Sequence, residues 1–355
     1  MVLAKIGVGL DIGTSSIKIV ELEGGNPIKV NHFGRILLPE DALSGGVIKN
    51  KEMVSKAIVN VLQQTKVKYR KLQAAIAGQS VIVRTIKMPL MSENELVNAI
   101  RWEAERYIPF PVDEVTLDYV IMNTDKQQQE MDVMLVCAHN DIIFSHVHTL
   151  RDAGIQPLAI DIQPFALMRS QGLHKIDNKE SVAVIDFGAG TTDLTIAKEG
   201  ISRFTRIIPL AGNRFTENIA KRMDIDFNQA EQLKIQFSDA LFSFNGNNSE
   251  DSEYQVNMVV QESLQELTLE LRRSFDYYQL QQRNELVTKL ILAGGGSKLK
   301  NLIPYLSQTF GLEVVLSQES QEITLVDKKL QNEFNEMKPI LMVAYGLALR
   351  EVIEE

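Results

Sequence analysis

The sequence predicts an α/β fold with two duplicated lobes around a nucleotide cleft. Two stretches far apart in the chain, 9–20 and 184–196, each contain an apolar strand, an aspartate, a glycine-containing turn and a second strand. This order of elements is that of a β-hairpin. Glycine lets backbone N–H groups approach an anion closely, and the hydroxyl residues of both turns add hydrogen-bond donors. Two such hairpins in one chain predict a duplicated fold that closes over a nucleotide.

Each hairpin offers one aspartate and a set of donors. The candidate donors in the first turn are Gly13, Thr14, Ser15 and Ser16, and those in the second are Gly188, Gly190, Thr191 and Thr192. The aspartates are Asp11 and Asp186. A carboxylate does not bind phosphate, but it can hold a hydrated cation that does. We therefore expect the turns to bind an anion and the two aspartates to bind a cation.

A third glycine-rich turn follows a short apolar strand near the end of the chain. The strand is predicted at 290–293, and a helix is predicted at 299–306. The turn between them consists of Gly294, Gly295, Gly296 and Ser297. Bare backbone at the start of a helix can accept a flat ring or a phosphate.

The remaining elements of the first half follow from hydrophobic spacing. Residues 6–37 predict strands joined by tight turns, and 51–64 predict a helix with one apolar stripe. Residues 73–160 predict a self-contained α+β module. Its strands are expected at 72–77, 81–86, 116–122, 131–138 and 157–161, and its helices at 92–108 and 140–153. Ser92 and Glu95 form a capping-box pattern at the start of the first of these helices.

The second half predicts mainly helices outside its hairpin. Short helices are expected at 215–221 and 229–234, a polar surface loop at 243–253, and a helix at 339–349. A long helix is expected at 256–282. Its buried stripe, at gaps of three and four, consists of Leu264, Leu267, Leu271, Phe275 and Tyr278.

Composition excludes several classes of function. A chain of 355 residues is long enough for two domains with substantial cores. Its net charge of −9 argues against a nucleic-acid partner, which normally requires a basic face. Cys137 is the single cysteine, so no internal disulfide can form. No stretch approaches the roughly 20 apolar residues that a membrane-spanning helix needs.

The order and spacing of the three glycine-containing motifs resemble those of the actin-like ATPase superfamily. The hairpins resemble its two phosphate motifs, and the turn at 294–297 resembles its adenosine motif. The resemblance implies ATP as ligand, with Mg²⁺ positioned by Asp11 and Asp186. It also implies that Lys18 lies near the phosphates, the alternative being a surface lysine on a strand edge. Asp193 is expected to be structural within its hairpin.

Three stretches narrow the resemblance to the PilM family of type IV pilus assembly, with the cell-division protein FtsA as the next match. They are the first hairpin (9–22), the segment 100–110 ending in Tyr-Ile-Pro-Phe, and the segment 270–278. PilM and FtsA carry an extra subdomain before the second hairpin, where 73–160 lies here. FtsA-like proteins end in an amphipathic membrane helix, whereas this sequence ends without a basic apolar tail. The resemblance thus favours PilM and implies no direct membrane insertion.

The fold implied by the resemblance is an actin-like ATPase fold with an FtsA/PilM-type extra α+β subdomain. The implied subdomains are 1A (1–72, 161–181 and 338–355), 1C (73–160), 2A (182–210 and 286–337) and 2B (211–285).

The resemblance also suggests which residues contact the nucleoside and which residue takes part in catalysis. Glu270 and Arg273 share a face of the long helix, where the superfamily has an acid and a base that face ribose and adenine. The alternative is a surface ion pair, which contributes little to stability. Gln163 lies where related ATPases have a residue that orients the attacking water. Glutamine can align a water but cannot act as a general base, so we expect slow hydrolysis or none.

The resemblance implies a cytoplasmic ATP-binding scaffold that is peripheral at the inner membrane. In PilM-like proteins a groove receives the cytoplasmic N-terminal peptide of PilN, a single-span membrane protein. We expect that groove between the 73–160 module and the first lobe. The strand Val81–Met88 is its candidate wall, and the alternative is an internal strand of the module.

Other partners and functions stay open at this point. Other pilus assembly components and self-association are further candidate interactions. The alternative functions are an FtsA-like filament-forming ATPase and, less favoured, a small-molecule kinase of the same fold.

Overall fold

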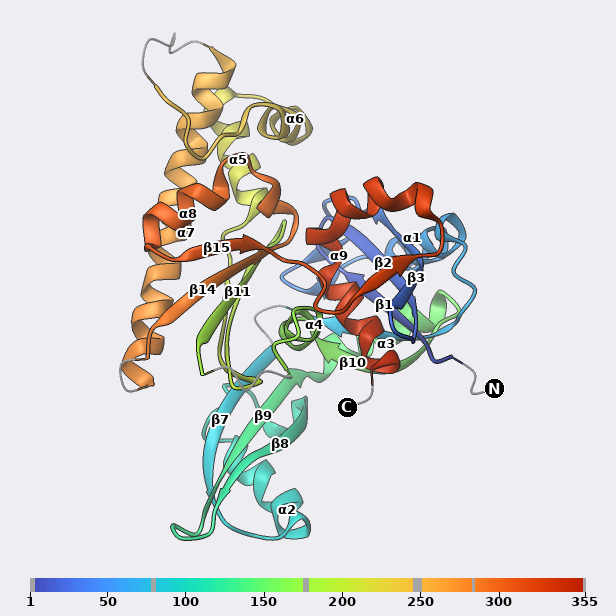
Figure 1. The fold of residues 1–355 in the computed structure, drawn as a ribbon, viewed down its shortest axis with the longest axis vertical. Coiled ribbons are helices and arrows are strands. Elements are labelled where there is room, and N and C mark those ends of the chain that lie inside the picture. Colours follow the sequence, from blue (N-terminus) through green and yellow to red (C-terminus); the bar gives the residue numbers. More distant parts are fainter. Residues whose placement is uncertain (1–3, 78–80, 175–178, 245–250, 283–284, 354–355) are drawn as a thin grey trace.

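The computed structural model describes residues 4–353 except 78–80, 175–178, 245–250 and 283–284. Two lobes stand side by side, each built on one mixed sheet (Figure 1). The first sheet contains, in spatial order, β10 (Gln156–Ile162), β6 (Lys71–Ile76), β1 (Ile6–Ile12), β2 (Ser16–Glu23), β3 (Ile28–Leu37) and β16 (Ile323–Leu325). The second contains β15 (Glu313–Leu316), β14 (Val287–Ala293), β11 (Ser181–Phe187), β12 (Thr192–Lys198) and β13 (Ile201–Ile208).

Five strands of each sheet share one topology, which confirms the predicted duplication, and the first sheet adds β16 in parallel beside β3. In each lobe three consecutive strands form an antiparallel meander, β1–β2–β3 and β11–β12–β13. In each lobe two further strands then add in parallel beside the first strand, β6 and β10 or β14 and β15. Because corresponding strands end at corresponding edges, the two hairpin turns are placed opposite each other.

Two helices cross between the lobes. They are α4 (Gln163–Ser170) and α9 (Gln331–Val352), which pack against each other. Their approach requires a glycine, because a Cβ on Gly346 would lie 1.8 Å from the carbonyl oxygen of Ala166. Strand β1 approaches α9 as closely, since a Cβ on Gly9 would lie 2.0 Å from the carbonyl oxygen of Ala344. These close contacts fix the position of α9 against α4 and β1.

Helix α9 begins at Gln331, eight residues before the start predicted from Pro339. Proline favours the first turn of a helix, which explains the prediction. The helix continues through Pro339 because Phe334 and Met337, one turn earlier, are buried in the core between the lobes. The backbone N–H of Gly294 donates to the carbonyl oxygen of Pro339 at 2.8 Å, so α9 also fixes the third glycine-rich turn.

Helices cover both lobes. In the first lobe they are α1 (Lys51–Thr65) and α3 (Asn140–Asp152), beside the short hairpin of β4 (Leu43–Ser44) and β5 (Val47–Ile48). In the second lobe they are α5 (Gly212–Met223), α6 (Phe227–Phe237), α7 (Ser252–Gln281) and α8 (Leu302–Phe310). Short 3₁₀ turns occur at Val112–Glu114, Gly295–Lys298 and Lys328–Leu330.

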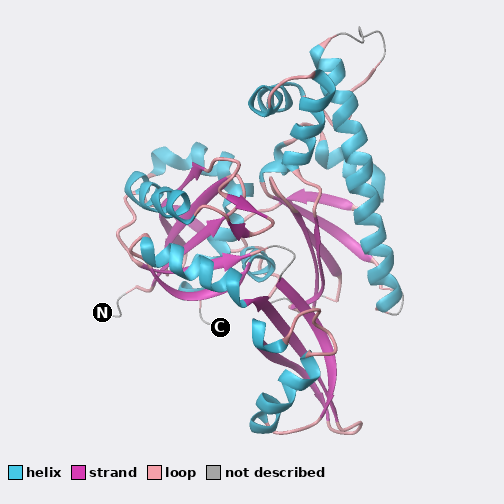
Figure 2. Cartoon of the chain, turned by 180° about the vertical axis from the view of Figure 1, so that it is seen from behind, coloured by secondary structure: helices cyan, strands magenta, loops and turns pink. Residues whose placement is uncertain are grey.

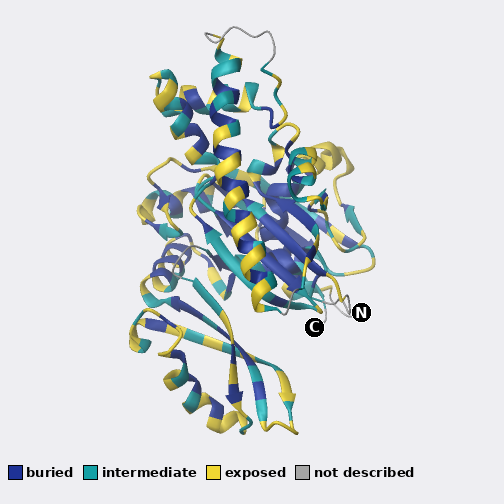
Figure 3. Ribbon diagram, turned by 90° about the vertical axis from the view of Figure 1, so that its left-hand side faces the viewer, coloured by how far each residue is buried: buried dark blue, intermediate teal, exposed yellow. Residues whose placement is uncertain are grey.

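Helix α7 lies along the second sheet with its outer face exposed (Figure 3). Leu264, Leu267, Leu271 and Tyr278 of its predicted stripe are buried, and Phe275 is half-buried. The helix starts earlier than predicted because the Asp251 side chain accepts a hydrogen bond from the N–H of Glu253. Residues 245–250 of the predicted loop lie outside the described residues.

A small three-stranded sheet projects from the lobes (Figures 1 and 2). Its order is β7 (Val81–Pro89), β9 (Glu130–His139), β8 (Val115–Asp125), and α2 (Glu93–Ala104) packs on one face. The predicted capping box at Ser92 and Glu95 is present. The strands at both ends of the predicted 73–160 module form, but as β6 and β10 they pair within the first lobe. The projecting part is therefore shorter than that range, and the remaining subdomain boundaries stay a prediction.

Within the described residues, no helix combines the length and apolar character that crossing a membrane requires.

Candidate functional site

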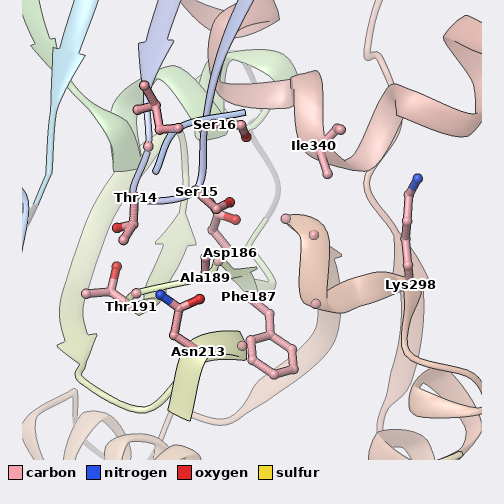
Figure 4. Close-up of a pocket in the computed structure, with 18 of the residues that line it drawn as sticks. Thr14, Ser15, Ser16, Asp186, Phe187, Ala189, Thr191, Asn213, Lys298 and Ile340 are labelled. Atoms are coloured by element: carbon pink, nitrogen blue, oxygen red, sulfur yellow. The ribbon is translucent and has the colours of Figure 1, made fainter. Parts of the chain in front are cut away.

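A cavity of about 1050 Å³ lies between the lobes, and we call it the interlobe cavity. Both hairpin turns, the third glycine-rich turn, α5, α6 and the middle of α9 line it. Figure 4 shows Thr14, Ser15 and Ser16 from the first lobe opposite Ala189 and Thr191 from the second. The sequence predicted that these turns form one site, and the structure brings them together.

The first hairpin presents a neutralised aspartate. Asp11, near the end of β1, accepts hydrogen bonds from Gln163 Nε2 at 2.9 Å and pairs with Lys18 Nζ at 3.0 Å. Lys18 lies directly across the β1–β2 ladder from Asp11, so the pairing follows from the hairpin register. Gln163 is the first residue of α4, directly after β10. The three predicted residues therefore form one contact network.

The second hairpin reaches across the cavity to the first. A Cβ on Gly190 would lie 2.6 Å from Thr14 Oγ1, so the two turns are in contact and leave no room for a side chain there. The start of α5 holds this turn through two backbone hydrogen bonds. Gly212 N–H donates to Gly188 O at 3.1 Å, and Asn213 N–H donates to Ala189 O at 2.8 Å. Asn213 lines the cavity, and sequence reasoning did not identify it.

The two acids of the second hairpin, Asp186 and Asp193, are buried and have raised pKa values. Burial, and next the charge of Asp11, raise the pKa of Asp186 to about 6, against the opposing effect of Lys18. Burial, and next the charge of Asp186, raise the pKa of Asp193 to about 8, although a hydrogen bond from Thr191 opposes this. Among the described residues Asp193 Oδ1 has no hydrogen-bond partner. Asp193 also lines the cavity, and the structural role expected for it within the hairpin stays a prediction.

These carboxylates suit a hydrated cation. Asp11, Asp186 and Asp193 all line the cavity, and burial, followed by the charge of the neighbouring aspartates, raises the pKa values of Asp186 and Asp193. Within the described part of the chain, no three acidic, histidine or cysteine side chains group as direct metal ligands. A cation that keeps several waters, as Mg²⁺ does, would bridge such separated acids through its hydration shell.

The third glycine-rich turn closes the cavity beside Asp186. Gly294 has φ +82°, and a Cβ there would lie 2.2 Å from Asp186 Oδ1. A Cβ on Gly296 would collide with the Phe187 ring at 2.4 Å. Gly294, Gly295 and Gly296 line the cavity, but Ser297 is buried and its hydroxyl donates to Gly294 O at 2.6 Å. Bare backbone near Ile340 and Lys298 is thus left open to a flat ring (Figure 4).

Two residues on α6 that the sequence prediction missed line the same cavity. Glu231 pairs with Lys234 Nζ at 2.6 Å, one turn apart on the helix. Lys234 Nζ also donates to Gly212 O at 3.0 Å and to Thr216 Oγ1 at 2.7 Å. Burial lowers the pKa of Lys234, while Glu231 opposes that effect. This half-buried acid–base pair lines the cavity, and its own contacts fix the position of the Lys234 ammonium.

Besides Ser297, three predicted site residues lie away from the cavity lining. Glu270 and Arg273 form an ion pair on α7, and Glu270 also binds Arg206 of β13 at 2.6 Å. The structure therefore does not bring them together with the turns, whereas Glu231 and Lys234 of α6 line the cavity. Thr192 is buried, and its hydroxyl donates to Leu210 O at 2.7 Å. Its role is to hold the second hairpin against the following segment.

A second cavity of about 240 Å³, the strand-edge pocket, borders β7. Its walls are residues 81–84 of β7, Ile76 at the end of β6 and Ala77 after it, Pro164 of α4, Asp193 and Leu194 of β12, and residues 205–207 of β13. Strands β7 and β13 are each the edge of their own sheet. The sequence expected a groove between the module and the first lobe; this pocket along β7 has the second lobe as its opposite wall.

A family model, solved structures and sequence relatives resemble this chain over most of its length. A family model described as "Type IV pilus assembly protein PilM" matches residues 9–352. The solved structure of a "PilM-PilN type IV pilus biogenesis complex" is similar with a TM-score of 0.85 and 30% identity, covering 98% of this chain and 99% of that one. The cell division protein FtsA of Pseudomonas aeruginosa is 26% identical over 352 residues, covering 88% of this chain and 82% of its own.

More distant structures share the fold. MreB 5 of Spiroplasma citri bound to AMPPNP is similar with a TM-score of 0.54 and 14% identity, covering 98% of this chain and 96% of that one. The predicted actin-like ATPase fold is thereby confirmed.

Proposed function

The chain belongs to the PilM family of type IV pilus assembly proteins, and from that premise we propose that it is an ATP-binding scaffold of the pilus assembly complex. The observation that carries this proposal is similarity in both fold and sequence to a solved PilM–PilN complex over 98% of the chain. The FtsA relative is more distant, so a filament-forming division ATPase is not favoured. A small-molecule kinase stays an untested alternative.

The proposed nucleotide is ATP in the interlobe cavity. The turns around Gly13 and Gly188 would bind the phosphates through backbone N–H and hydroxyl groups. Lys18, held beside Asp11, would add positive charge near them. The bare backbone of 294–296 would receive the adenine, with Glu231 and Lys234 on the ribose side. Mg²⁺ would be held through its waters by Asp11 and Asp186, and it would neutralise the phosphates.

Turnover is expected to be slow. Gln163 donates its amide to Asp11, so its carbonyl oxygen remains available to accept from a water in the cavity. An amide can orient the water but cannot remove its proton. ATP is therefore proposed to act mainly as a ligand that stabilises one arrangement of the lobes.

The proposed partner is the cytoplasmic N-terminal peptide of a PilN-like single-span membrane protein. An extended peptide suits a site between unpaired strand edges, because backbone hydrogen bonds give affinity and side-chain pockets give register. The strand-edge pocket along Val81–Arg84 offers such edges. This partner would place the protein at the cytoplasmic side of the inner membrane.

Two binding measurements test the proposal. Calorimetry with Mg-ATP should detect one site, and calorimetry with a synthetic N-terminal peptide of the PilN-like protein from the same genome should detect another. A peptide of the same composition in scrambled order is the control. The scaffold proposal is wrong if the native peptide binds no better than the scrambled one. Sedimentation with and without ATP addresses the alternative, because a filament-forming ATPase would pellet with nucleotide.

A further inference from the structure

Three charged side chains form one row across the first sheet. Asp11 of β1 lies directly opposite Lys18 of β2, and Lys18 lies directly opposite Arg35 of β3. Residues directly opposite each other on neighbouring strands share a face of the sheet, and all three residues line the interlobe cavity. The first-lobe side of the cavity therefore presents one carboxylate followed by two neighbouring cations.

The two cations differ in their partners. Lys18 Nζ is 3.0 Å from Asp11 Oδ2, and the Lys18 side chain is only 14% exposed. Arg35 is exposed, and it forms no ion pair with any residue in the described part of the chain. Like charges directly opposite each other on neighbouring strands destabilise a sheet. An anion in the cavity beside this row would offset the repulsion, so Arg35 has the capacity to bind one.

Helix α9 covers the neighbouring row on the same face but leaves the charged row open. Side chains share a face at every second residue of a strand, which places Gly9 and Phe33 beside the charged row. A Cβ on Gly9 would lie 2.0 Å from Ala344 O, and the Phe33 ring packs against the Phe334 ring with centroids 5.0 Å apart. The apolar row is thus sealed by α9, whereas the charged row opens into the cavity.

The end of β3 is attached to the first hairpin turn. Leu38, directly after β3, donates its backbone N–H to Ser15 O at 2.9 Å. Leu37, the last residue of β3, lies directly opposite Ser16. These backbone contacts fix the position of Arg35 relative to the N–H and hydroxyl donors of the turn.

The lining of the cavity runs in a fixed order from the second lobe to the first. A Cβ on Gly294 would lie 2.2 Å from Asp186 Oδ1, so the third glycine-rich turn touches the second hairpin. The second hairpin touches the first at Gly190 and Thr14, and β3 is the next strand beyond the first hairpin. A nucleotide whose base lies on the third turn therefore points its terminal phosphate toward β3.

We propose that Arg35 contacts the terminal phosphate of the bound nucleoside triphosphate and thereby determines the preference for ATP over ADP. This rests on the proposed function for the identity of the ligand. The planar guanidinium can donate two parallel hydrogen bonds to phosphate oxygens, which a lysine ammonium cannot do. ADP lacks the phosphate that this contact requires, so Arg35 is a specificity-determining residue.

The test is calorimetry of the full chain with Mg-AMPPNP and, separately, with Mg-ADP. In Arg35→Gln the Kd for Mg-AMPPNP should rise about ten-fold, the loss expected for one hydrogen bond to a charged group, while the Kd for Mg-ADP stays the same. Arg35→Lys keeps the charge without the planar fork and should lose less. Arg151→Gln is the matched control, because Arg151 is an exposed arginine of α3 outside the cavity lining.

The two nucleotides and a stability measurement separate the possible outcomes. An equal loss for both nucleotides, or no loss for either, would overturn the role of Arg35 at the terminal phosphate. Failure of the unaltered protein to bind Mg-AMPPNP would count against the proposed function itself, and the role of Arg35 would fall with it. Without nucleotide, Arg35→Gln should unfold at the same temperature as the unaltered protein or higher, because a repulsion with Lys18 is removed. A lower Tm would assign Arg35 to the stability of the sheet instead.

Discussion

Asp193 lies directly across the β11–β12 ladder from Asp186, in the place that Lys18 takes across from Asp11 in the first hairpin. Side chains directly opposite on neighbouring strands share a face, where opposite charges stabilise and like charges destabilise. The duplicated hairpins therefore differ at one decisive position. The first is neutralised internally, whereas the second carries two buried acids whose pKa values are raised.

The first prediction concerns the proposed Mg²⁺. Asp186→Asn should weaken Mg-ATP binding about ten-fold, which is about 1.4 kcal/mol, because it removes a carboxylate anchor for the hydrated metal. In EDTA the same variant should bind ATP as well as the wild type or better, because a negative charge near the phosphates is gone. Calorimetry in both buffers measures this, with the exposed Asp276→Asn on α7 as control. An equal loss in both buffers would mean that the change acts on the fold rather than on the metal.

The second prediction concerns pH. The pKa of Asp193 rises from 3.8 unfolded to about 8 in the folded protein, so the native state binds this proton more tightly than the unfolded chain. The resulting stability is present below about pH 4 and is lost as pH rises through about 8. Asp193→Asn lacks this loss, so its Tm advantage over the nucleotide-free wild type should grow from pH 5 to pH 8.5. Thermal unfolding at the two pH values checks this; a constant difference contradicts it.

A third prediction separates two neighbouring glycines in one turn. Gly294→Ala should cost several kcal/mol, about 2–5, because its φ is +82° and the new Cβ would meet Asp186 Oδ1 and Phe187 O. Gly295→Ala is the matched control, since its nearest contact would be Ile340 Cγ2 at 3.9 Å. Denaturant unfolding of both variants measures the difference. Similar stabilities would mean that the close approach to Asp186 does not constrain the turn.

The fourth prediction decides which acid–base pair faces the nucleoside. Lys234→Met on α6 should weaken ATP binding about ten-fold, the loss expected for one hydrogen bond to a charged group. Arg273→Ala on α7 should leave ATP affinity unchanged, because that side chain lies outside the cavity. Nucleotide titration of both variants, with circular dichroism to verify the fold, distinguishes the sites. The opposite ranking would restore the assignment made from the sequence.

That assignment shows where sequence reasoning stops. Glu231–Lys234 and Glu270–Arg273 are both acid–base pairs three residues apart on helices, so local pattern cannot rank them. Their placement depends on how α6 and α7 pack around the second sheet. The hairpins were predictable because an aspartate, a glycine turn and two apolar strands are local signals.

The strands β6 and β10 illustrate the same limit. Their existence was predicted from apolar runs, but their membership of the first sheet depends on parallel pairing between residues far apart in sequence. Asp193 is a related case, because its place in the lining of two cavities was not predictable from its sequence neighbours. Its neighbours in the hairpin are visible in the sequence, whereas the strand-edge pocket on its other side is built by β7 and Pro164.

The crossing of β1 and α9 has a consequence for how the chain matures during synthesis. The strands of the second sheet come from one continuous stretch, 181–316, whereas the first sheet receives β16 and its covering helix α9 only afterwards. On the ribosome, the second lobe can therefore fold while β1, the earliest strand translated, still lacks the helix that packs against Gly7 and Gly9. The nascent chain thus carries the unfinished apolar surface of β1 until α9 emerges, and we expect it to be prone to aggregation during that interval.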